Sequence, residues 1–121
     1  MNFKKDNFIV IKKTISEELS NFVYRYFLLK RKVADTLYKK KYIPNNSPEW
    51  GVWSDQQVPN TYSHYSDIVM ETLLLDVQPI MEKLTELQLV PTYSYARIYK
   101  KGDILHRHKD RPSCEISTTL N

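Results

Sequence analysis

Apolar residues recur at three- and four-residue spacing over a long stretch near the start of the chain, which predicts an amphipathic helix. Thr14 and Glu17 have the spacing of a capping box, so we expect this helix to begin there and to run to about Tyr38. Before it, Phe8-Ile9-Val10-Ile11 is short, apolar and β-branched, and this run predicts a first strand.

The middle of the chain loses this periodicity and then regains it. Residues 41–63 contain three prolines and predict a loop, in which Trp50 and Trp53 are expected to pin the loop to the core rather than form a lid. A second helical region is predicted from about Ser66 to Leu89. Pro79 should kink this helix or divide it, because proline removes a helical donor.

The last third of the chain changes to a two-residue alternation. Residues 93–99 predict a strand, and Lys100-Lys101-Gly102-Asp103 predicts a turn. Residues 104–110 are expected to be extended, residues 111–113 to form a corner, and Cys114 to Asn121 to form another strand. Helices followed by antiparallel strands indicate an α+β fold with helices packed on one side of a sheet.

Length and composition fit one ordinary globular domain. The chain has 121 residues, of which 41% are hydrophobic and 26% charged. No apolar run is long enough for a membrane span or a signal peptide, so we expect a cytoplasmic protein without membrane partners. The single cysteine, Cys114, excludes an internal disulfide and is expected to be buried on a strand rather than reactive.

The formal charge of +4 comes largely from one basic run, Lys30-Arg31-Lys32 to Lys39-Lys40-Lys41. A solvated helix face is the favoured interpretation of this run. The alternative is a basic module that binds nucleic acid or an acidic partner.

His108-Lys109-Asp110 is the central chemical feature. On an extended strand, residues i and i+2 face the same side, so this imidazole and carboxylate can converge on one metal ion. His106 would lie about 13 Å from Asp110 on such a strand, too far to share the ion. His64, at the start of the second helical region, is expected to be structural.

A polar face precedes this pair. Tyr93, Tyr95, Arg97 and Tyr99 alternate onto one side of the predicted strand. Three phenols and a guanidinium suit a cavity that holds a dicarboxylate, because arginine binds a carboxylate in a two-pronged manner. The alternative is a sheet face exposed to water.

The stretch Tyr99-x-x-Gly102-x-x-x-x-x-His108-x-Asp110 resembles the prolyl-4-hydroxylase-like branch of the 2-oxoglutarate- and iron(II)-dependent dioxygenases. The block from residue 93 to residue 121 is similar to phage and marine microbial members. The resemblance implies helices packed on an antiparallel double-stranded β-helix, or jelly roll. Residues 1–92 would be the helical support region, and residues 93–121 would be the first core strands.

The resemblance also implies an activity, namely oxidative decarboxylation of 2-oxoglutarate to succinate coupled to hydroxylation of a substrate C–H bond, in this branch a peptidyl one. His108 and Asp110 would be the catalytic residues and iron ligands, and Tyr99 would contact 2-oxoglutarate, with Arg97 and Tyr95 as further candidates. The implied cofactors are Fe(II) and 2-oxoglutarate, with ascorbate as a candidate reductant. The partners are dioxygen and an unknown substrate.

The sequence departs from the family pattern at its C-terminus. The distal histidine and the basic residue that binds the far carboxylate of 2-oxoglutarate would follow Asn121, so we expect a truncated domain. An unpaired edge at Cys114–Asn121 would then favour self-association. Two alternatives stay open: the basic binding module, and a non-catalytic virion or assembly protein on the same scaffold. A phage-encoded protein would act in the host cytoplasm.

Overall fold

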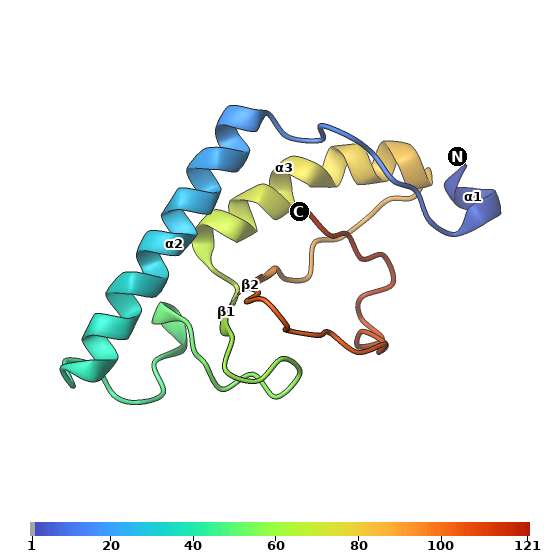
Figure 1. Cartoon of the computed structure of the whole chain (residues 1–121). Coiled ribbons are helices and arrows are strands. Elements are labelled where there is room, and N and C mark those ends of the chain that lie inside the picture. Colours follow the sequence, from blue (N-terminus) through green and yellow to red (C-terminus); the bar gives the residue numbers. More distant parts are fainter. Residues whose placement is uncertain (1) are drawn as a thin grey trace.

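The computed structural model describes residues 2–121 and has an α+β fold, as predicted. Three α-helices, a short 3-10 helix and a two-stranded antiparallel sheet follow one another along the chain (Figure 1). The elements are α1 (Phe3–Asp6), α2 (Glu17–Lys39), η1 (Pro48–Trp50), β1 (Tyr62–Tyr65), α3 (Ile68–Thr85) and β2 (Tyr95–Ile98).

Helix α2 has nearly the predicted extent but a different cap. Ser16, not Thr14, precedes the first turn, and its hydroxyl accepts a hydrogen bond from the backbone N–H of Leu19 at 3.1 Å. The predicted capping box is therefore wrong, because a box on Ser16 would require a glutamate or glutamine where Leu19 stands. Along the helix, Val23, Phe27 and Ala34 provide its buried face.

Helix α3 is shorter than predicted and is not divided. Asp67 caps its N-terminus by accepting from the backbone N–H groups of Val69 and Met70. Glu86 ends the helix in the left-handed conformation, with φ 59°. Pro79 lies inside one continuous helix, so the carbonyl four residues before it lacks the usual helical donor.

Asp67 also joins the two long helices. Its Oδ2 accepts from the Tyr26 hydroxyl at 2.5 Å and from Lys30 Nζ at 2.6 Å, both on α2. The carboxylate is fully buried, and the lysine side chain is 14% exposed. From this junction beside the middle of α2, the two helices diverge (Figure 1).

The sheet pairs β1 with β2, with Ser63 opposite Arg97 in the register. The N–H and C=O of Ser63 instead bond to Val52 at 2.9 Å, so β1 has a neighbour on each side. In the described chain β2 pairs with β1 alone, which leaves its outer edge open. Strand β1 lies between the helices and partly within the predicted loop, so the predicted order of helices first and strands later is wrong.

The core forms where α2, η1 and β1 meet. Phe27 and Tyr62 pack with ring centroids 5.2 Å apart, and Trp53 packs on Tyr62 at 4.8 Å. The Tyr62 hydroxyl donates to the backbone carbonyl of Trp50 at 2.5 Å. Both tryptophans therefore hold the loop against the core, which confirms that prediction.

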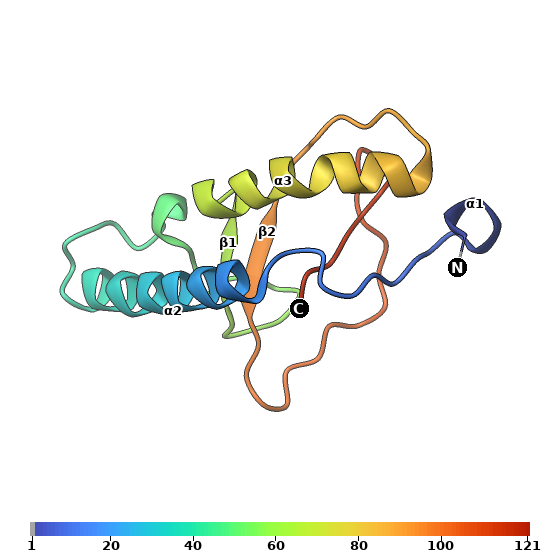
Figure 2. The ribbon, with the colours of Figure 1, turned by 90° about the horizontal axis from the view of Figure 1, so that it is seen from above.

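Three predicted extended segments form no strand. Residues 8–11, 104–110 and 114–121 have irregular structure, and the last of these therefore provides no sheet edge. A strand requires a hydrogen-bonded neighbour, and none lies beside these segments in the described chain. Figures 1 and 2 show residues 99–121 following a long open path, coloured orange to red.

The molecule exposes an unusually large surface. Its accessible area is 9639 Å², about 40% more than the ~6,800 Å² expected for a compact monomer of this mass. Large apolar side chains contribute to this area, for example Val10 at 67% and Ile68 at 76% exposure. Among the helices of residues 2–121, none has the length and apolar character needed to cross a membrane.

Candidate functional site

The structure brings the side chains of His108 and Asp110 together. His108 Nε2 and Asp110 Oδ1 lie 3.3 Å apart, although their segment is not a strand. The side chains are 36% and 42% exposed, so both remain accessible to an ion from solvent. The two side chains therefore lie close together as expected, but the strand that was expected to carry them does not form.

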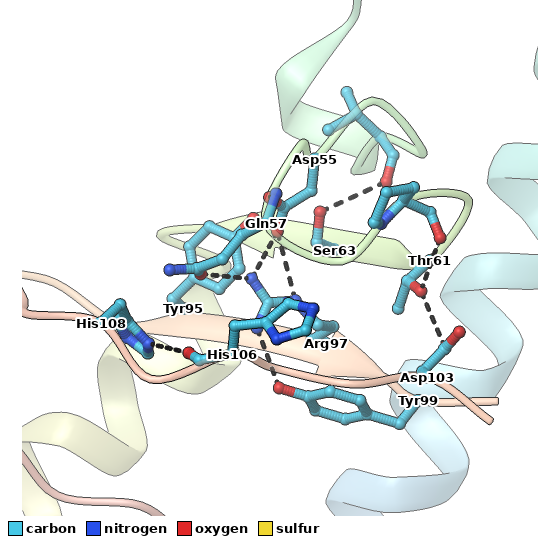
Figure 3. A network of polar contacts seen from close by, with 12 residues as sticks. Asp55, Gln57, Thr61, Ser63, Tyr95, Arg97, Tyr99, Asp103, His106 and His108 are labelled. Atoms are coloured by element: carbon cyan, nitrogen blue, oxygen red, sulfur yellow. Dashed lines mark hydrogen bonds and ion pairs between the residues drawn. The ribbon is translucent and has the colours of Figure 1, made fainter. Parts of the chain in front are cut away.

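Each of these side chains also makes a hydrogen bond on the side away from this contact. His108 Nδ1 lies 2.9 Å from the backbone carbonyl of His106 (Figure 3). A carbonyl oxygen only accepts, so Nδ1 carries the donated proton and Nε2 is the nitrogen that faces Asp110. On the other side, the Ser117 hydroxyl donates to Asp110 Oδ2 at 2.6 Å.

These two donor atoms fit a divalent cation. Two ligand atoms at right angles around an ion, each about 2.1 Å from it, stand about 3.0 Å apart, close to the observed 3.3 Å. A neutral imidazole whose other nitrogen donates to a carbonyl is the usual form of a metal-bound histidine. Within residues 2–121, three or more such ligand side chains do not gather at one point.

The other two histidines have different surroundings. His64 is 4% exposed, and its ring nitrogens lie 2.9 Å from the carbonyl of Tyr65 and 3.0 Å from that of Glu49. This confirms the prediction that His64 is structural. His106 is exposed and contributes its backbone carbonyl to the His108 contact.

The predicted polar face forms around Arg97. Its guanidinium lies over the rings of Tyr95 and Tyr99, 5.1 and 5.6 Å from their centroids, so these three side chains share one face as predicted. The guanidinium donates to Asp55 Oδ2 from Nη2 at 2.5 Å and from Nε at 3.2 Å. It also donates to Gln57 Oε1 at 2.9 Å (Figure 3).

The carboxylate held by this face belongs to the protein itself. Asp55 accepts from the Tyr95 hydroxyl at 2.6 Å as well as from Arg97, and its side chain is 11% exposed. Burial raises the pKa of Asp55, but the hydrogen bonds from Tyr95, Arg97 and the Gln57 backbone, with the arginine charge, outweigh it and lower the pKa. Asp55 is therefore a bound anion at neutral pH.

Tyr99 differs from Tyr95 in its hydrogen bonding: the Tyr95 hydroxyl donates to Asp55, whereas the Tyr99 hydroxyl accepts from Arg97 and can still donate its own proton. The hydroxyl accepts from Arg97 Nη1 at 2.9 Å, and the residue is 48% exposed. An accepting phenol can still donate its O–H to a carboxylate. Tyr99 is thus the member of this face best placed to receive an external anion.

Tyr93 leaves the predicted face and joins a separate cluster. Its ring lies 5.1 Å from that of Tyr65, and the guanidinium of Arg111 lies 4.3 Å from its centroid. A hydrogen bond with the Cys114 thiol, and then burial, raises the pKa of Tyr93. Cys114 is half-buried on an irregular segment, so the prediction of a buried strand residue is wrong.

The basic run does not form one continuous exposed surface. Lys30 points inward to Asp67, and Lys39 pairs with Asp35 at 2.8 Å one turn earlier on α2. The remaining cations of the run lie at partly or fully exposed positions, as expected for a solvated helix face.

The sequence offered no signal for several contributors to these clusters. Asp55 and Gln57 lie about forty residues before Arg97, and Ser117 lies beyond a chain reversal from Asp110. The Asp55 and Gln57 contacts depend on how distant segments fold together, and the Ser117 contact depends on the turn between residues 111 and 114.

A scan against protein-family models and searches of curated proteins and of solved structures gave no match to this chain.

Proposed function

We propose that this chain supplies two iron ligands, His108 and Asp110, of a 2-oxoglutarate-dependent dioxygenase domain. The observation that carries the proposal is the 3.3 Å distance between His108 Nε2 and Asp110 Oδ1. The other nitrogen of the imidazole and the other oxygen of the carboxylate each make a hydrogen bond within the chain. Two protein ligands leave room in the coordination sphere for 2-oxoglutarate, dioxygen and one further donor.

The proposed fold extends the observed sheet. Strands β1 and β2 would begin a double-stranded β-helix, and the helices within residues 1–92 would support it. The open edge of β2 and the large exposed surface support this view, because both provide places for additional strands.

The proposed roles follow from the contacts. His108 and Asp110 hold the ion, and Tyr99 donates its hydroxyl proton to a carboxylate of 2-oxoglutarate. Arg97 and Tyr95 support Tyr99 indirectly. Both donate hydrogen bonds to Asp55, and Arg97 also orients the Tyr99 hydroxyl. Bound Fe(II) and 2-oxoglutarate supply the oxidative decarboxylation and the hydroxylation of a C–H bond, in this branch a peptidyl one.

The test is an anaerobic visible-absorption titration of the whole chain with Fe(II) and 2-oxoglutarate. We expect a charge-transfer band in the parent that disappears in His108→Ala and after chelation of the metal. His106→Ala is the matched control and should keep the band, because the backbone carbonyl that supports His108 remains. A parent without a band, or a band that survives His108→Ala, would overturn the proposal.

A further inference from the structure

The two oxygens of Asp110 have different environments. Oδ1 faces His108 Nε2 at 3.3 Å, while Oδ2 accepts the Ser117 hydroxyl at 2.6 Å. A hydroxyl-to-carboxylate distance of 2.6 Å is typical of a charge-assisted hydrogen bond. The two oxygens of the carboxylate are therefore distinguished by the fold before any ion is bound.

A chain reversal brings the serine to this position. Ser117 follows Asp110 by seven residues, and the backbone N–H of Cys114 donates to the carbonyl of Arg111 at 2.9 Å between them. The segment turns back on itself through this corner. Without the Ser117 contact, an exposed aspartate would rotate about its terminal torsion, whose energy profile is broad.

The histidine beside it is held in a parallel way. His108 donates from Nδ1 to the His106 carbonyl, which fixes the ring and directs Nε2 toward Oδ1. Metal ligands commonly have outer hydrogen bonds of this kind, and removing such a partner costs 10- to 100-fold in metal affinity as a rough guide.

We propose that Ser117 is a positioning residue for the metal site. By holding Oδ2, its hydroxyl turns Asp110 so that Oδ1 stands beside His108 Nε2 and the two atoms bind one divalent cation. This inference rests on the proposed function, since it assumes that His108 and Asp110 bind the ion.

The experiment is an anaerobic titration of the whole chain with Co(II), read by the visible d–d bands and by calorimetry. Ser117→Val and Ser117→Thr form a matched pair of similar volume that differs in the hydroxyl. We expect Ser117→Val to weaken Co(II) binding about tenfold or more and to change the band intensities. Ser117→Thr should restore both, and Ser113→Ala, an exposed serine at the same corner, should behave as the parent.

The outcomes separate the two proposals. If the parent binds Co(II) through His108 and Asp110 but Ser117→Val has the parent affinity and spectrum, the positioning role is wrong and the metal site stands. If the parent shows no Co(II) binding that depends on His108, both proposals fail. Circular dichroism of each variant checks the fold, and a loss in Ser117→Val that Ser117→Thr does not rescue also rejects the role of the hydroxyl.

Discussion

At the scale of single residues, Asp67 has the most demanding environment in the described chain. Its carboxylate is fully buried, caps α3 and accepts from Tyr26 and Lys30 on α2. We expect Lys30→Met to lower the free energy of unfolding by about 3 kcal/mol, because it leaves a buried charge without its cation. Thermal unfolding measures the loss. Lys32→Met, at an exposed position on the same helix, is the control, and equal losses in the two variants would contradict this role.

The same carboxylate predicts an acid sensitivity. Burial raises the pKa of Asp67, but hydrogen bonds from Lys30, Tyr26 and the Met70 backbone, with the lysine charge, outweigh burial and lower it. Its contribution is present above the ordinary aspartate pKa of about 4 and is lost as the pH falls through the lower folded value. Melting temperatures should therefore fall below about pH 4, and less steeply in Asp67→Asn. Equal slopes would assign the sensitivity to other carboxylates.

Two glycines with positive φ provide a matched comparison. Gly51 has φ 85°, and a Cβ there would collide with the Tyr62 phenol, whereas Gly102 has φ 91° and open space around it. Gly102→Ala should lose about 1–2 kcal/mol from backbone strain alone. Gly51→Ala should lose about 1–3 kcal/mol more, because it also displaces a core ring. Similar melting temperatures for the two variants would show that the Tyr62 side chain can move aside at little cost in stability.

Sequence reasoning at this scale succeeded where the pattern was local. Strand alternation predicted that Tyr95, Arg97 and Tyr99 share a face. His108 and Asp110 do lie close together, but on an irregular segment and not on the strand from which their approach was predicted. The partners that complete the two clusters were not predicted: Asp55 comes from a distant segment, and Ser117 reaches Asp110 through an irregular turn. Nothing in the neighbourhood of Arg97 indicates that a distant aspartate neutralises it.

At the scale of elements, α3 carries a proline where helices seldom tolerate one. Pro79 lies inside the helix on an exposed position and removes one backbone donor. We expect Pro79→Ala to stabilise the protein by about 1–3 kcal/mol and to increase its helical circular dichroism. Pro48→Ala, at the start of η1 where no donor is needed, should bring no gain. A lower melting temperature for Pro79→Ala would mean that the proline ring contributes packing.

Helices and strands differed in how well the sequence predicted them. Helices α2 and α3 depend on periodicity and caps within their own segments, so their existence was clear and only their ends shifted. Strand formation depends on a neighbour elsewhere in the chain. Residues 8–11 have strand composition but no partner, whereas β1 has partners on both sides despite lying in a proline-rich region.

At the scale of the whole molecule, helices α2 and α3 meet where Asp67 contacts α2 and then diverge, and the last twenty residues follow an irregular path (Figures 1 and 2). The core therefore occupies a small region around Tyr62, between α2 and β1. The pattern of predicted helices and strands correctly indicated an α+β chain, but it could not reveal how much of the apolar surface would stay outside that core.

The large accessible surface has a consequence for the response to urea. The 9639 Å² exposed in the folded state means that unfolding uncovers only about four-fifths of the area that a compact chain of this mass would uncover. Because the dependence of unfolding free energy on urea concentration scales with that newly uncovered area, its slope should be reduced in the same proportion. This protein should therefore unfold over a broad range of urea concentration. The heat-capacity increment of unfolding should shrink alongside the slope, which flattens the dependence of stability on temperature.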